Sequence, residues 1–206
     1  MSAATQSKLS AAALPVVLQR ADLQGKALAS VAGLESVEAV VAALAQAGFG
    51  IEATRVLAHA LPKREAVWWA CMCALHTAPA ALPEPDRKAR EQAEGWVRQQ
   101  SMTHARAAME EARRAGFQSP EAWAGVAAFW SGESLAPPDA PAVTPPPHLT
   151  GIAVAGALAL ASVRLDAARQ PQRLAMFLQS AQDIAAGGPG RPVSYTHLTL
   201  PTKRIV

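Results

Sequence analysis

The stretch Leu61–His76, LPKREAVWWACMCALH, decides the fold of this chain. It begins with Pro62 and three charged residues and then continues for ten residues without a polar side chain. Proline is tolerated in the first turn of a helix, and ten apolar residues cover nearly three turns and leave no face for water. The stretch therefore predicts a central helix over residues 62–77, with the adjacent Trp68 and Trp69 in the core.

The composition indicates an all-α protein. Half of the residues are hydrophobic and 17% are charged. The spacing of the apolar residues predicts a compact bundle of about seven to eight helices arranged as helical hairpins, with a solenoid-like stack as the alternative. We expect a single helical domain over residues 36–186.

Start signals locate several of the helices. Ser36, Asp86 and Ser101 stand where a helix cap is expected, and Ser119-Pro120-Glu121 combines a cap, a proline and an acid. Besides the central helix, the predicted helices cover residues 36–47, 51–60, 86–100, 101–115, 120–131, 149–165 and 170–186.

Three segments are predicted to lie outside regular helices. Residues 1–35 show weak periodicity and are expected to form a poorly ordered arm with one short helix. Residues 131–147 contain six prolines and predict an extended strap, which either docks a partner or packs on its own domain. Trp96, Trp123 and Trp130 are expected in the core, and carbonyls of the helix ends and of the strap are the expected acceptors for their indoles. Residues 187–206 are expected to be a disordered tail.

The last part of that tail, residues 193–206, resembles a translated sequencing adapter. Residues 193–202 read VSYTHLTLPT, the peptide that a common transposon end encodes in one frame. Such scars are excluded from fold reasoning, so we read the natural chain to about Arg191. Lys203 and Arg204 belong to this part and account for most of the formal net charge of +3, so the charge does not favour nucleic acid.

No motif for catalysis, a metal or a cofactor is found. The sequence lacks HExxH, CxxC, GxSxG, Walker A and GxGxxG patterns. Cys71 and Cys73 are two positions apart, which on a helix turns them about 200° from each other, so buried free thiols are expected. The alternative is a small enzyme with an unrecognised site, which would need one pocket to hold at least two of the following residues: His59, Glu65, His76 and Asp86.

The charged start of the central helix is the candidate partner-binding site. Lys63, Arg64 and Glu65 precede Trp68, and Arg64 lies four positions before this tryptophan, where stacking is expected. Arg and Trp are frequent anchors at interfaces. The alternative is that the charges are the solvated first turn of a buried helix. In that case Trp68→Ala truncates the core and costs about 3–5 kcal/mol.

Three strings of the sequence are distinctive. They are LAHALPKREAVWWAC at 57–71, AGFQSPEAWAGVAAFWSGESLAPP at 115–138 and PPPHLTGIAVAGAL at 145–158. Together they resemble an uncharacterised proteobacterial family of small all-helical proteins often encoded near type VI secretion genes. The resemblance covers residues 40–186. It implies a cytoplasmic accessory role with a protein partner, such as a component of the secretion apparatus, and it implies no activity.

Other partner classes are disfavoured. Five basic residues, Arg87, Lys88, Arg90, Arg113 and Arg114, alternate with acids, which is typical of a solvated face rather than a nucleic-acid surface. The longest apolar stretch, 149–163, is shorter than the roughly 20 residues of a membrane span. The N-terminus lacks the apolar core of a signal peptide, which favours the cytoplasm.

Overall fold

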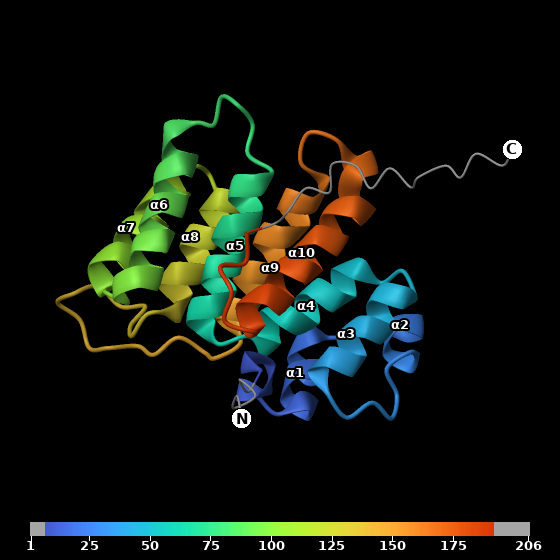
Figure 1. The fold of residues 1–206 in the computed structure, drawn as a ribbon. Helices are drawn as coiled ribbons and strands as arrows, with labels where there is room; N and C mark the ends of the chain where they lie inside the picture. Colours follow the sequence, from blue (N-terminus) through green and yellow to red (C-terminus); the bar gives the residue numbers. More distant parts are fainter. Residues whose placement is uncertain (1–6, 192–206) are drawn as a thin grey trace, which may run out of the picture.

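The computed structural model describes residues 7–191, and this part of the chain folds into helices joined by turns and one long connection (Figure 1). The helices are η1 (Lys8–Ala11), α1 (Leu14–Ala21), α2 (Gly25–Ala29), α3 (Val37–Gln46), α4 (Gly50–Ala60), α5 (Lys63–His76), α6 (Glu84–Gln99), α7 (Met102–Arg114), α8 (Pro120–Ser131), α9 (Leu149–Val163), η2 (Ala167–Arg169) and α10 (Gln170–Ala185). The predicted all-α class is confirmed.

Helix α5 is the centre of the bundle. It contacts α6 and α8 on one side and α4, α9 and α10 on the other (Figure 1). Helices α6, α7, α8 and α9 each pack on the next, but α9 also packs on α4 and α5, which precede it by five and four helices. In a solenoid each repeat contacts only its neighbours, so the arrangement is a closed bundle and not a solenoid.

The sequence located the helices from residue 36 onward. The side chains of Ser36, Ser101 and Ser119 accept hydrogen bonds from backbone N–H groups of α3, α7 and α8, as predicted. The expectation for Asp86 is wrong. Helix α6 begins two residues earlier, with Pro83 as its N-cap, and Asp86 lies buried in the first turn. A carboxylate in that turn is still favourable because it faces the positive end of the helix dipole.

The predicted poorly ordered arm is wrong over residues 7–35, since η1, α1 and α2 lie in this range. Helix α1 packs on α4, and Leu9, Val17, Ala21 and Leu23 are buried in the common core. These helices are too short to be stable alone, and tertiary packing of their apolar residues stabilises them. Because these helices are so short, the periodicity of their apolar residues in the sequence is also weak. Residues 1–6 lie outside the described part.

Close contact between helices explains the abundance of small residues. At Gly125 of α8, an added Cβ would lie 2.8 Å from the carbonyl oxygen of Ala108 in α7. Ala105, Ala108 and Ala112 are buried along α7. The backbones therefore approach more closely than larger side chains would allow, and dense packing with few aromatic residues becomes feasible.

The proline-rich strap packs on its own domain at its beginning. The carbonyl of Ala136 accepts a hydrogen bond from Arg106 of α7 at 2.9 Å, and residues 137–144 are exposed. For the indoles of Trp96, Trp123 and Trp130, helix ends and the strap are the predicted acceptors. Trp123 donates to the carbonyl of Phe117, between α7 and α8, so its acceptor lies near a helix end and not in the strap. Trp68 and Trp69 donate to the carbonyls of Pro189 and Phe177, also outside the strap.

The predicted boundary of a disordered tail at residue 187 is also wrong for residues 187–191. This segment turns back over α10, where the N–H of Gly190 donates to Asp183 at 2.7 Å and the hydroxyl of Ser180 donates to the Gly190 carbonyl. The rest of the predicted tail, including residues 193–206, lies outside the described residues.

Among the helices of residues 7–191, none is by itself both long and apolar enough to cross a membrane. Helix α9 and the segment Ala167–Ala185 meet the criterion of length and composition together, but they are bent by 117° at the break between them.

Candidate functional site

Helix α5 is not enclosed on all sides, contrary to what its unbroken apolar run predicts. Trp68 is half-buried, and Leu75 keeps 47% of its surface exposed. Arg64, Trp68, Met72 and Leu75 are spaced by four, four and three residues, so they share one stripe of the helix. Two pockets lie along this stripe, and both are lined by Trp68 and Arg98.

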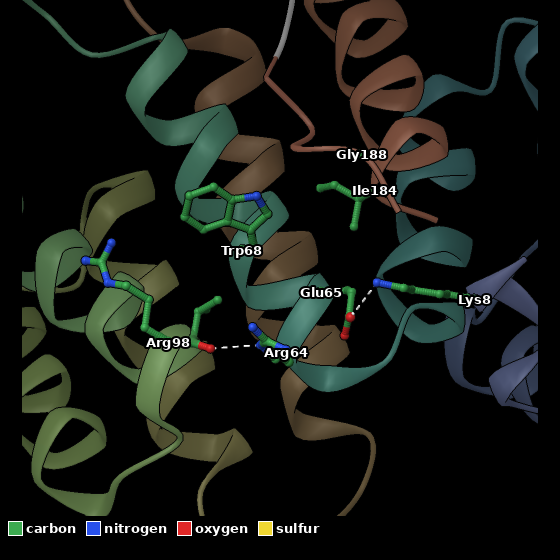
Figure 2. Close-up of a pocket in the computed structure, with 8 residues that line it drawn as sticks. Lys8, Arg64, Glu65, Trp68, Arg98, Ile184 and Gly188 are labelled. Atoms are coloured by element: carbon green, nitrogen blue, oxygen red, sulfur yellow. Dashed lines mark hydrogen bonds and ion pairs between the residues drawn. The ribbon is translucent and has the colours of Figure 1, made fainter. Parts of the chain in front are cut away.

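The first pocket has a volume of about 340 Å³ and lies at the start of α5. Figure 2 shows Trp68 between α6, which carries Arg98, and the region of Ile184 and Gly188. The second pocket, of about 440 Å³, continues toward the end of α5. We call the two together the α5 groove. Its residues are Lys8, Arg64, Glu65, Trp68, Met72, Leu75, His76, Arg90, Glu94, Val97, Arg98, Ile184, Gly188 and Arg191.

Three of the predicted partner-binding residues, Arg64, Glu65 and Trp68, line this groove. The Nε of Arg64 donates to the carbonyl of Val97 at 2.8 Å, which ties α5 to α6. Glu65 forms an ion pair of 2.9 Å with Lys8, visible in Figure 2. The described structure shows no stacking of Arg64 on Trp68, so that expectation is wrong.

Trp68 joins the groove to the C-terminal segment. Its indole N–H donates to the carbonyl of Pro189 at 2.8 Å. The hydrogen bond fixes the edge of the ring, and the indole itself is only half-buried. A tryptophan held in this way presents a rigid apolar surface at little cost in conformational entropy, as anchor residues at interfaces do.

The groove carries an excess of positive charge. Five cations line it and two carboxylates oppose them. Glu65 is paired with Lys8, and Glu94 is paired with Arg90, an ion pair in which both side chains are largely buried. Arg98 lies 3.7 Å from Glu94 and remains 62% exposed. The guanidinium groups of Arg64, Arg98 and Arg191 are therefore the exposed charges around Trp68.

Lys63, the fourth predicted residue, lies elsewhere. It lines a separate pocket together with Arg20, His59, Leu61 and Thr150. Lys63 and Arg64 are neighbours in the sequence, but successive residues of a helix are rotated by about 100° about its axis, so the two lie on different surfaces. Arg98, Arg191 and Lys8 are groove residues that the sequence analysis missed. They belong to other segments, and nothing local to them signals the groove.

The residues named for an enzyme do not meet in one of these pockets. Glu65 and His76 lie in the two halves of the groove, His59 lines the separate pocket, and Asp86 is buried in α6. Burial, together with the positive charge of Arg20, lowers the pKa of His59 to about 4. In residues 7–191, no three His, Cys, Asp or Glu side chains are grouped as metal ligands would be.

The two cysteines are buried and free, as predicted. Burial raises the pKa of both the Cys71 and the Cys73 thiol. A thiol that stays protonated is a poor nucleophile, so these side chains act as small apolar residues of the core.

The five basic residues of α6 and α7 that were considered for nucleic acid are paired within their own helices. Each pairs with an acid three or four positions away: Arg87 with Glu91, Lys88 with Glu84, Arg90 with Glu94, Arg113 with Glu110, and Arg114 with Glu110 and Glu111. The interleaving of charges predicted for this face is confirmed, and the face has no large excess of either sign.

The fold and the groove define an all-helical bundle with one open, cationic side of its central helix. Residues 40–185 match a family of unknown function (DUF6931), and the chain belongs to this family. The matched range includes Arg64, Glu65, Trp68 and Arg98. No curated protein and no solved structure matches the chain.

Proposed function

We propose that this protein is a non-catalytic interaction module that binds a protein partner through the α5 groove. The observation that carries the proposal is Trp68, a half-buried tryptophan surrounded by exposed arginines on a helix that is otherwise the core of the bundle. Tryptophan and arginine are the residues most enriched among those that dominate binding energy.

The proposed setting is the bacterial cytoplasm, and the proposed role is accessory to type VI secretion. The resemblance of residues 57–71, 115–138 and 145–158 to a family often encoded near type VI secretion genes supports this setting. The buried, reduced Cys71 and Cys73 are compatible with a reducing compartment.

Co-purification of the tagged full chain from its native host tests the proposal. We expect a stoichiometric protein partner, identified by mass spectrometry as a secretion-system component, and we expect Trp68→Ala to lose it. Arg113→Glu serves as a control, because Arg113 is an exposed, ion-paired arginine on α7, outside the groove. Recovery of the chain alone under cross-linking conditions, or equal capture by the Trp68 variant, would contradict the proposal.

A further inference from the structure

The floor of the α5 groove is an apolar stripe between two walls of different character. Trp68, Met72 and Leu75 form the floor. One wall is α6, which contributes Arg90, Glu94 and Arg98 at successive turns. The other is the end of α10 with the segment that follows it (Figure 2). A ligand on this floor therefore meets apolar side chains below it and charges along its sides.

The charged side chains of the groove differ in how many of their polar atoms already have a partner within the protein. Arg90 and Lys8 already have carboxylate partners. Arg64 is exposed and uses its Nε for the Val97 carbonyl, and within residues 7–191 its terminal nitrogens have no hydrogen-bond or ion-pair partner. Arg98 and Arg191 both line the second pocket and are exposed, although Arg98 also lies 3.7 Å from Glu94. These arginines can accept carboxylates in the two-bond geometry that a guanidinium favours.

We infer, on the basis of the proposed function, that the segment of the partner that occupies the groove is acidic and amphipathic. Its apolar side chains pack on Trp68 and Leu75, and its carboxylates pair with Arg98, Arg191 and Arg64. Trp68 and Leu75 are seven residues apart, about 10 Å along the helix. An amphipathic helix with apolar residues at the same spacing fits this distance, which is the helix-in-groove mode of recognition.

Charge complementarity favours this ligand over a basic or neutral segment. A basic segment would face the three exposed arginines. A neutral one would partly desolvate these arginines without adding a carboxylate partner, which costs free energy. A ligand with charge alone would leave the exposed surfaces of Trp68 and Leu75 uncovered. Both properties are therefore required of the same segment.

Fluorescence anisotropy with the full chain and labelled synthetic peptides tests the inference. The probe is a peptide of about 14 residues with leucines at helical i, i+4 and i+7 spacing and Asp or Glu elsewhere. Three comparison peptides are needed: one with Asn and Gln in place of the acids, one with Lys, and one that keeps the acids and replaces the leucines with serine. We expect the acidic amphipathic peptide to bind at least about tenfold more tightly than each of the others, and to weaken as salt is raised.

Matched charge reversals locate the binding. Arg98→Glu and Arg191→Glu should each weaken the acidic peptide by about tenfold or more, and Arg113→Glu should change its affinity by less than about twofold. Arg98 and Arg113 are a close match, since both are on helices, both pair with a nearby Glu, and their side chains are 62% and 64% exposed. Circular dichroism of each variant verifies that the bundle is folded.

Several results would overturn the inference. One is equal binding of the acidic peptide and the peptide with Asn and Gln in place of the acids. Another is binding of the serine peptide as tight as that of the leucine peptide, which would define a site for any polyanion. A loss with Arg113→Glu as large as with Arg98→Glu would indicate non-specific attraction. If the native partner depends on Trp68 but none of the acidic peptides binds, the interaction module stands and the acidic, amphipathic character of its ligand is wrong.

Discussion

Trp68 and Trp69 are adjacent in the sequence, yet they belong to different parts of the molecule. Trp69 has no exposed surface, and its indole donates to the carbonyl of Phe177 at 2.9 Å within the core. Trp68 is half-buried, lines both pockets of the groove and donates to Pro189 in the C-terminal segment. A rotation of about 100° per residue separates the two surfaces of α5.

This contrast shows how one helix serves two purposes. The side with Ala66, Trp69 and Cys73 contributes to the packed interior, where each side chain is fixed by its neighbours. The side with Arg64, Trp68 and Leu75 faces a groove whose walls come from other helices. The first side determines stability and the second provides a surface for recognition, so substitutions on the two sides should have separable effects.

The largest expected effect is that of Trp69→Ala. Truncating a fully buried tryptophan removes its packing and its hydrogen bond and should lower the free energy of unfolding by about 3–5 kcal/mol. Urea unfolding followed by circular dichroism measures the loss. A loss below about 1 kcal/mol would show that Trp69 does not pack as the structure describes.

The next largest effect is a pH dependence that originates at the buried His59 of α4. Burial and Arg20 lower the pKa of His59 to about 4 in the fold, against about 6.5 in an unfolded chain, so the unfolded chain binds more protons between these values. Stability is therefore fully present above pH 6.5 and should fall by up to about 3 kcal/mol as the pH is lowered toward 4. Urea unfolding at a series of pH values gives the slope.

Two variants identify the histidine that causes this dependence of stability on pH. His59→Asn removes the titrating group and should flatten the curve in this range. His76→Asn should flatten it less, because His76 lies at the groove and is only partly buried, although burial and the nearby Arg169 also lower its pKa. If the slope is unchanged in the His59 variant, the acid sensitivity has another origin.

Trp68→Ala should have a smaller effect, about 1–2 kcal/mol, because the ring is only partly buried against the core and its one hydrogen bond lies at the surface. The sequence had placed this tryptophan in the core and assigned it the larger loss that we now expect for Trp69. Hydrogen exchange should also show faster exchange around residues 187–190. A loss of stability as large as that for Trp69→Ala would mean that the two sides of α5 are not separable.

The smallest effect should be that of Lys8→Ala at the edge of the groove. The Lys8–Glu65 pair is solvent-accessible, with side chains 39% and 18% exposed, so its removal should cost about 0–1 kcal/mol and less in high salt. Lys88→Ala on α6 is the matched control, since it removes another accessible lysine–glutamate pair. A cost well above that of the control would show that the ion pair holds η1 against the bundle.

Much of the fold was predictable from the sequence from residue 36 onward. The caps at Ser36, Ser101 and Ser119 and the apolar periodicity are local signals, and they located the corresponding helices within about two residues. For residues 7–35 the sequence predicted one short helix without locating it, where the structure has η1, α1 and α2, because short segments carry little periodicity and depend on packing against α4 and its neighbours.

The candidate site was predictable only in part. The charged start of α5 pointed to Arg64, Glu65 and Trp68, which do line the groove. Lys63 was assigned to the same surface because a linear sequence does not show which way the helix faces. Arg98 and Arg191 come from distant segments, and no pattern near them in the sequence connects them to Trp68.

The sequence by itself determined that this protein is all-helical and that Leu61–His76 forms its central helix, because caps, prolines and the spacing of apolar residues act over a few residues. Only the tertiary structure decided which of two adjacent tryptophans is buried and that α6 and the segment after α10 enclose the other in a cationic groove. The physical reason is that the exposure of a helix face depends on what packs against it, and that is fixed by contacts between residues far apart in the chain.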